Sequence, residues 1–323
     1  MAVSNISSFS SPNNLSVLNA TAYSSHSSSA LHYSIQALVS GVGCVILIIF
    51  GGCILYVILS DTVFKEELRY VLLVNLLLSN ISYFCLQSVI TAVYSYQVQI
   101  VRPVCSVCMI VIKTCMRSET TTLSTMALDR YVAVCWPFKH YNICGPHAHG
   151  KILLAVWFFS ALQPVTFLVT EYIFNPSVVS SQECSFVIWF PQWLLNISTI
   201  FAVSYIAVCA LVILLTYILI YREGKNSGAM SSTNIQARRT LLMHGVQMSF
   251  YVVPAVVIHA VLVPEILNIL GPATYSLINL LMFVVFTVGQ CFCPIIYGFY
   301  QRDIRIQCFK KLNMFRVGVA PRE

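Results

Sequence analysis

Three ionisable side chains, Lys113, Arg117 and Glu119, stand close together inside one apolar stretch of the sequence. A Lys, Arg or acidic side chain at the centre of a bilayer costs about 2.5–3.5 kcal/mol on insertion scales. All three facing lipid would cost on the order of 8–10 kcal/mol. We therefore expect the helix that carries them to be central in its fold, with protein or water on most of its sides.

Helical geometry separates the three side chains. Lys113 and Arg117 are four residues apart and share a face, whereas Glu119 lies about 200° from Arg117 on the opposite side. The two cations suit an outward-opening cavity that binds an anionic ligand group. An ion pair with another acid, such as Glu171 or Glu183, explains the cations equally well. A ligand that displaces this acid would combine both interpretations.

Glu119 is acidic and has no obvious role in binding an anionic ligand group. Its carboxyl group could bind a cation, hold a proton, or form a hydrogen bond with a neighbour such as Asn80. A buried carboxyl group without a nearby cation is expected to be neutral, because burial penalises the charged form.

The composition supports a membrane setting for these residues. Of the 323 residues, 58% are hydrophobic and 9% are charged, against about 25% charged in a typical soluble domain. The mean hydropathy is +0.80. So few charges cannot cover a soluble protein of this size, and they exclude a disordered chain or a coiled coil. The 13 cysteines are scattered, which excludes a secreted disulfide scaffold.

Seven stretches are long enough to span a bilayer, whose core of about 30 Å needs ~20 apolar residues of helix. The connectors between them are too short to fold as domains. We predict an all-α membrane protein with a bundle of seven transmembrane helices. The predicted spans are 36–60, 70–94, 104–128, 152–173, 192–221, 240–263 and 273–300.

Two independent patterns place the N-terminus outside the cell. Asn5, Asn14 and Asn19 each begin an N-x-S/T glycosylation motif in a charge-free segment. With this orientation, 15 of the 18 Lys and Arg residues fall on the inner side, one (Arg102) on the outer side and two within a span. Such a bias is typical of cytoplasmic loops. We therefore expect a multi-pass membrane protein with a glycosylated extracellular tail and a cytoplasmic C-terminus.

The segment after the last span resembles a short amphipathic helix. Ile304, Cys308 and Leu312 recur at helical spacing, and basic residues fill the other face, which suits binding to the lipid of the inner leaflet. Cys308 is a candidate palmitoylation site, and an unmodified thiol fits the pattern equally well. The predicted divisions are an extracellular tail (1–35), a seven-helix transmembrane domain (36–300), and a cytoplasmic amphipathic helix with its tail (301–323).

Asp129, Arg130 and Tyr131 stand at the inner end of the third predicted span. Adjacent acidic and basic side chains can hold each other in a resting state. Breaking that pair frees a long cation at the cytoplasmic mouth, which gives a two-state element that a distant ligand can bias. An ordinary interfacial charge pair is the simpler alternative.

The segment 128–135, Leu-Asp-Arg-Tyr-Val-Ala-Val-Cys, together with Pro137, resembles the rhodopsin-like (class A) G-protein-coupled receptors. Within these it is most similar to vertebrate odorant receptors, and especially to the fish type. The resemblance covers about residues 36–312. It also rests on the first inner loop (64–70), the start of the sixth span (240–247), Thr216 with Tyr217, and the segment from Pro294 to Tyr297.

The resemblance implies a receptor that activates a heterotrimeric G protein of the stimulatory, olfactory type and raises cyclic AMP. Arg130, Tyr217 and Tyr297 would then support the G protein. It also implies a disulfide between Cys105 and Cys184, and a location in the plasma membrane of sensory cilia.

Three residues depart from the family pattern. Gly52, Asn80 and Cys293 replace the usual Asn, Asp and Asn of a receptor sodium site. We therefore expect a protonated or hydrogen-bonded Glu119 rather than a bound sodium ion.

The expected ligand is a small odorant that carries an acidic or anionic group. A non-olfactory class A receptor for a small ligand remains an alternative, and a transporter is disfavoured because the spans show no internal repeat. No HExxH or GxSxG motif supports an enzyme, and we expect no cofactor, metal or nucleic-acid partner. The predicted ligand-binding residues are Lys113, Met116, Arg117, Tyr205 and Tyr251.

Overall fold

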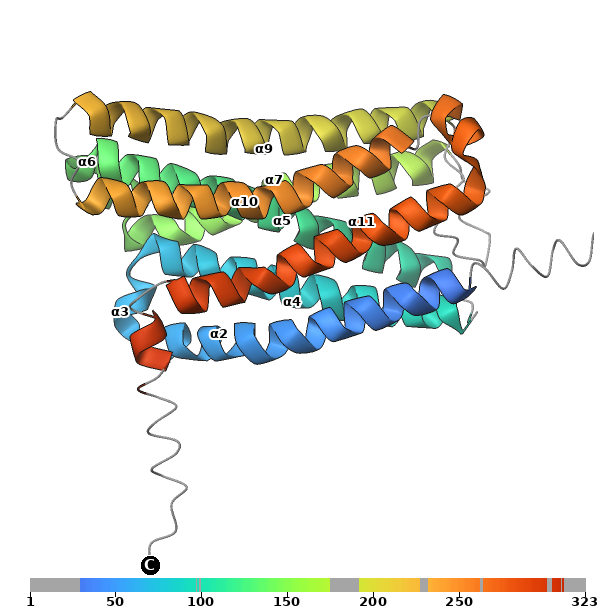
Figure 1. Ribbon diagram of the computed structural model, residues 1–323, viewed down its shortest axis with the longest axis horizontal. Helices are drawn as coiled ribbons and strands as arrows, with labels where there is room; N and C mark the ends of the chain where they lie inside the picture. The colour runs from blue at the N-terminus through green and yellow to red at the C-terminus, as the bar shows by residue number, and fades with distance from the viewer. Residues whose placement is uncertain are drawn as a thin grey trace, which may run out of the picture.

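A computed structural model describes residues 30–96, 98, 100–174, 192–226, 232–261, 264–300, 304–308 and 310. Within these ranges the chain is helix and short connections, without strands. Seven long helices of the described chain lie side by side in a bundle (Figure 1), as the sequence predicts. They are Ala30–Leu59, α4 (Leu68–Ser95), α5 (Arg102–Cys135), α7 (Pro146–Phe174), α9 (Gln192–Asn226), α10 (Ser232–Val261) and α11 (Pro264–Tyr300).

Five of the described helices are long and apolar enough to cross a bilayer. These segments are Ala30–Leu59, Leu68–Ser95, Pro146–Thr170, Ile200–Glu223 and Ala273–Phe292. Helix α10 has a shorter apolar part, Gly245–Ile258. Helix α5 is long enough but carries charged residues along its length, so it depends on protein neighbours rather than lipid.

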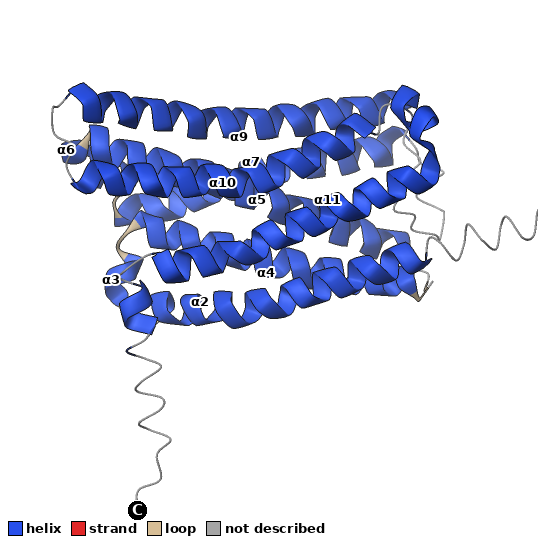
Figure 2. Ribbon diagram, in the orientation of Figure 1, coloured by secondary structure: helices blue, strands red, loops and turns tan. Residues whose placement is uncertain are grey.

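Helix α5 occupies the middle of the bundle, where it contacts α4, α7, α9 and α10 (Figure 1). This agrees with the expectation that its charged side chains face protein or water. Figure 2 shows helix along the middle of the bundle, with the described loops and turns at its ends. In the described residues the centre is therefore built from contacts between helices.

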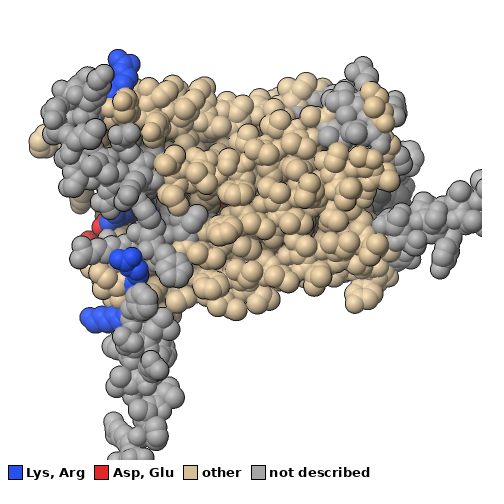
Figure 3. Space-filling view, in the orientation of Figure 1, with Lys and Arg blue, Asp and Glu red and all other residues tan. Residues whose placement is uncertain are grey.

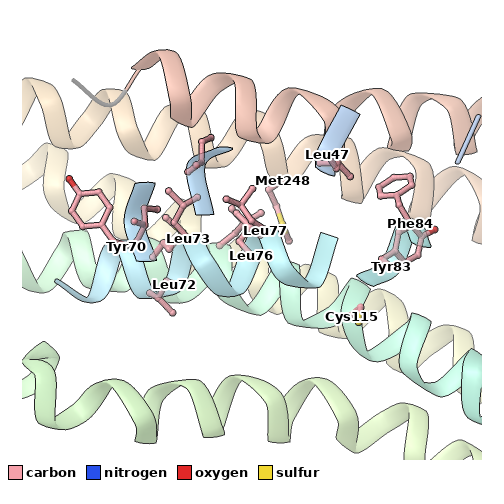
Figure 4. Packing of buried hydrophobic residues seen from close by; sticks show 14 of the residues in the cluster. Leu47, Tyr70, Leu72, Leu73, Leu76, Leu77, Tyr83, Phe84, Cys115 and Met248 are labelled. Atoms are coloured by element: carbon pink, nitrogen blue, oxygen red, sulfur yellow. The ribbon is translucent and has the colours of Figure 1, made fainter. Parts of the chain in front are cut away.

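The largest part of the hydrophobic core lies along α4. Leu72, Leu73, Leu76 and Leu77 are fully buried and follow one face of this helix (Figure 4). Their spacing of one, three and four residues gives the apolar stripe of an amphipathic helix. Leu78, on the opposite side, is 48% exposed, as expected for a side chain that meets lipid.

The predicted connectors contain helices that the apolar pattern missed. Short helix α3 (Thr62–Lys65) is capped by Asp61, whose side chain accepts a hydrogen bond from the Val63 amide at 3.1 Å. Helix α6 (Pro137–Cys144) begins with a proline, a residue favoured at the first helical position. Helix α5 itself continues to Cys135, past its predicted end at residue 128.

The predicted loop 264–272 is also largely helical. Helix α11 begins at Pro264 and is interrupted at Gly271, whose φ of 74° lies in the left-handed region. Glycine adopts this conformation without the steric penalty that a Cβ atom brings. A short helix at one end of the bundle therefore turns directly into the last long helix.

The end of the bundle that carries α3 and α6 is called the basic end here. On the face shown in Figure 3, the visible Lys and Arg side chains gather there. Residues 304–308 are helical, with Ile304 fully buried against the core and Arg305 exposed. This pattern agrees with the predicted amphipathic helix, and Cys308 packs partly buried beside the core.

Candidate functional site

A cavity of about 380 Å³ lies between α5 and the surrounding helices α4, α7, α9, α10 and α11. Aromatic and aliphatic side chains form most of its wall, and a few polar groups interrupt them. Such a mixture is typical of small-molecule sites. Lining residues include Tyr83, Lys113, Met116, Arg117, Thr120, Gln163, Ser198, Tyr205, Ile206, Pro254, Asn279, Phe283 and Phe286.

Four of the five residues predicted to bind a ligand line this cavity: Lys113, Met116, Arg117 and Tyr205. Lys113 and Arg117 lie on the same wall because they are one helical turn apart on α5. Tyr251 belongs to α10, but its side chain lies outside the described residues.

Among the described residues, the guanidinium group of Arg117 packs against an aromatic ring. Its Cζ atom lies 4.7 Å from the centroid of the Tyr205 ring, a cation–π contact between α5 and α9. Its Nη1 atom is buried and makes no hydrogen bond with any described residue. Glu171 and Glu183, the predicted alternative partners, have side chains outside the described residues.

Hydroxyl groups fix the position of the Tyr205 ring. The Tyr205 hydroxyl is hydrogen-bonded to Thr121 of α5, and Thr121 is 3.3 Å from the Ser160 hydroxyl of α7. The ring is therefore anchored to two other helices. Arg117 lines the cavity, and its planar donor fork suits a carboxylate or a related oxyanion.

Two amide side chains complete the polar part of the wall, and the sequence interpretation missed both. Gln163 donates to the Ser198 carbonyl at 3.3 Å, and its own Oε1 atom is buried without a described partner. The side-chain nitrogen of Asn279 donates to the Tyr275 hydroxyl at 3.5 Å, and its side-chain oxygen accepts from Nε2 of Gln36 at 3.5 Å. A lone amide within an apolar span is the signal that could have identified both residues, because such groups are costly to bury unless they bind something.

Asn80 and Glu119 are fully buried, as their positions within spans predict. Asn80 makes no hydrogen bond with any described residue, so a bond between these two side chains is absent. The Glu119 carboxyl group lies close enough to Tyr83 and Cys115 to interact with them electrostatically.

A different polar network joins α4, α5 and α7. The side-chain nitrogen of Asn75 on α4 donates to Thr122 at 2.9 Å and to Ser118 at 3.2 Å. The Trp157 ring nitrogen donates to the side-chain oxygen of Asn75 at 2.9 Å. One amide thus holds three helices in register, away from the cavity. Buried and fully satisfied networks of this kind favour a single arrangement of the helices.

At the basic end, Asp129 and Arg130 attract each other electrostatically, as the predicted resting pair requires, although no direct ion pair joins them among the described residues. The Asp129 carboxylate is 3.0 Å from Nε2 of His140 on α6. Arg130 lies near Glu67 and Arg69 as well as Asp129. Glu67 and Arg69 form an ion pair with each other.

Other predicted switch residues also lie at the basic end. Tyr131 and Tyr217 pack with Val134 around the buried Ile220, which joins α5 to α9. The side chain of Tyr297, in α11, lies outside the described residues.

The predicted modification sites fall mostly outside the described residues, including Asn5, Asn14 and Asn19. Cys105 is disulfide-bonded, and its predicted partner, Cys184, also lies outside them.

Comparison with known proteins identifies the architecture. Residues 22–297 match the family described as the 7 transmembrane receptor (rhodopsin family). The chain is 24% identical to odorant receptor 131-2 of Danio rerio over 184 residues, which are 55% of either protein. It is 25% identical to probable G-protein coupled receptor 148 of Homo sapiens over 218 residues, covering 63% of the chain and 60% of that relative.

A third relative is olfactory receptor 4K13 of Homo sapiens, with 25% identity over 206 residues. That match covers 60% of the chain and 64% of the relative. The chain thus matches between about half and two thirds of the length of these curated relatives.

Proposed function

The chain belongs to the seven-transmembrane receptors of the rhodopsin family, and we propose that it is a chemosensory receptor for small acidic odorants. It is a multi-pass membrane receptor and not an enzyme. Two of the relatives described above are named odorant or olfactory receptors. These names support an odorant as the ligand, whereas the acidic group is inferred from the cavity.

The single observation that carries this proposal is the Nη1 atom of Arg117, which is buried and has no hydrogen-bond partner among the described residues. A buried donor without an acceptor is unfavourable, and a charged donor more so. An anionic ligand group in the cavity would supply the missing acceptor. Lys113, one helical turn away on the same wall, would add a second positive charge.

The remaining residues of the cavity wall determine the size and polarity of the rest of the ligand. Met116, Ile206, Phe283 and Phe286 offer an apolar surface, and the cavity of about 380 Å³ limits the ligand to a small molecule. We therefore expect an acid with a compact hydrocarbon or aromatic body. A neutral molecule of the same shape would fill the apolar part but leave the Arg117 donor unpaired.

Activation follows from a shift between two arrangements of the bundle. The cavity lies between α5 and the helices α9, α10 and α11, so a ligand that contacts both sides favours one spacing of these helices. The basic end then opens toward a heterotrimeric G protein, which we propose to be the stimulatory, olfactory type that raises cyclic AMP. Arg130, Tyr217 and Tyr297 would contact or support it.

This assignment requires the basic end to lie in the cytosol and the N-terminal segment outside the cell, in the plasma membrane of sensory cilia. An epitope tag placed before Asn5 should be accessible to antibody on intact cells, and a C-terminal tag should require permeabilisation. Staining of the N-terminal tag only after permeabilisation would contradict the orientation.

The ligand class is tested with a cyclic AMP reporter in cells that express the receptor at the surface. The panel should pair each carboxylic acid with its methyl ester, so that the two differ mainly in charge. We expect the active acids to be more potent than their esters. Esters or amines that activate the receptor as strongly as the matched acids would overturn the proposal.

A second candidate is a non-olfactory receptor of the same class for another small ligand. It is favoured by the similarity to probable G-protein coupled receptor 148, whose name carries no odorant function. Transcripts found outside sensory epithelium, together with a response to an acid that is not volatile, would support this candidate.

A further inference from the structure

Three side chains of the kinds that bind transition metals meet at the basic end, far from the cavity described above. They are Asp129 at the end of α5, and His140 and Cys144 on α6. One ligand atom from each lies within 4.8 Å of the other two. His140 and Cys144 are four residues apart on one helix and therefore project to the same side.

The surroundings favour a bound cation. Asp129 and Cys144 are each 6% exposed, so a carboxylate and a thiol are buried beside each other with little access to water. The side chain of His140 is 34% exposed. A cavity of about 640 Å³ adjoins all three residues and offers room for water on an ion.

From this geometry we propose that Asp129, His140 and Cys144 form a zinc site on the cytosolic side of the receptor. A mixed set of one oxygen, one nitrogen and one sulfur ligand suits Zn²⁺, whereas Mg²⁺ and Ca²⁺ prefer oxygen ligands alone. A tetrahedral ion with bonds of about 2.0–2.3 Å holds its ligand atoms about 3.3–3.7 Å apart. The three ligand atoms, which lie within 4.8 Å of one another, would move closer on binding, and water would fill the fourth position.

The charges around the cluster are compatible with a divalent ion. Arg130, Arg69, Glu66 and Glu67 line the same cavity. Because Arg69 is paired with Glu67, part of the positive charge is already neutralised. Binding replaces the proton of the Cys144 thiol with the metal, so the carboxylate and the thiolate together balance the two charges of the ion.

A second contact holds the end of α6 in position. Nε2 of His149, a buried residue on α7, is 3.2 Å from the Cys144 carbonyl oxygen. This hydrogen bond orients the backbone that carries the proposed sulfur ligand. Hydrogen bonds from residues outside the coordination shell orient metal ligands in other proteins in the same way. Zinc would therefore tie α6 to α5 at the basic end, where we propose that a G protein docks. The inference about metal binding is independent of the ligand and the G protein proposed above.

The test uses Co²⁺ as a spectroscopic probe on the full chain, purified in detergent and first treated with a chelator. We expect a sulfur-to-cobalt charge-transfer band that saturates near one equivalent and disappears when Zn²⁺ is added. The variant C144S should lose the band, and H140A should weaken binding about tenfold or more. Matched controls are C135S and H147A, which change a cysteine and a histidine near the same end and should keep the band.

Circular dichroism establishes that each variant retains its helix content. If C144S does not fold, H140Q provides the decisive comparison, because His140 lies nearer the surface. An absent band, or a band that is equal in the wild type and in C144S, would overturn the site and leave the three residues as a hydrogen-bonded cluster only.

Discussion

Replacing Arg117 by Met tests the proposed anion site at the atom on which it depends. Met removes the guanidinium donors but keeps a long side chain of similar reach beside the Tyr205 ring. A hydrogen bond to a charged group contributes about 1.5–3 kcal/mol, and about 1.4 kcal/mol corresponds to a tenfold change in affinity. We therefore expect the half-maximal concentration of an acidic agonist to rise about tenfold to somewhat over a hundredfold.

The stability of the variant should change little. The cation–π contact with Tyr205, 4.7 Å from the ring centroid, is lost and contributes about 0.5–2 kcal/mol. The same change removes a buried Nη1 atom that has no described hydrogen-bond partner, which offsets that loss. Surface expression close to that of the wild type is expected, so a weakened response can be attributed to binding.

The assay is a dose–response curve of cyclic AMP for an acid and its methyl ester, measured in the wild type and in R117M. The acid curve should move to higher concentration, while the ester curve stays in place. Met116→Leu is the matched control, since it conserves volume on the same wall and should shift neither curve strongly. An unchanged acid curve, or equal shifts for acid and ester, would refute the role of Arg117.

Three further predictions concern packing and thiol chemistry. Leu76→Ala should lower the free energy of unfolding by about 2–5 kcal/mol, because Leu76 is fully buried, and thermal melting in detergent measures the loss. Gly289→Ala should also lower the melting temperature, because an added Cβ would stand 2.4 Å from Phe250. Burial, and to a lesser extent the negative charge of Asp129, raises the pKa of the Cys144 thiol to about 11. With chelator present, the alkylation rate of this thiol should therefore rise about tenfold per pH unit from neutral pH toward that value.

Each of these predictions has an internal comparison. Leu78→Ala, at a position 48% exposed on the same helix, should melt close to the wild type, and equal losses at both leucines would contradict the packing account. Gly41→Ala meets no atom within 4 Å and should be tolerated. The alkylation signal must be absent from C144A, and a rate that is independent of pH would show that the thiol is not protonated at neutral pH.

The sequence predicted the bundle and the central position of α5 because both depend on local properties. Apolar stretches of ~20 residues specify spans regardless of their neighbours. The charges at Lys113, Arg117 and Glu119 exclude a lipid-facing helix on energetic grounds alone. Lys113, Met116 and Arg117 line one cavity because residues about one turn apart on a helix share a face.

The features that the sequence did not predict depend on contacts between elements. The Asp129 carboxylate also contacts His140, and this depends on helix α6, a short element without an apolar stretch of its own. Asn75 joins three helices through partners up to 82 residues away. Gly271 allows a turn between two helical segments where a loop was expected. No periodicity within a single segment contains this information.

The proline at the cavity wall has a mechanical consequence. Pro254 lies inside α10, where its missing N–H removes one backbone hydrogen bond of the helix. From Pro254 back to Ser232 the helix extends over 22 residues, or roughly 33 Å at 1.5 Å per residue. A rotation of only about 5° about that weakened point moves the far tip by roughly 3 Å. The helix can therefore act as a lever arm, which converts a small displacement beside the cavity into a larger movement at the far end of the helix.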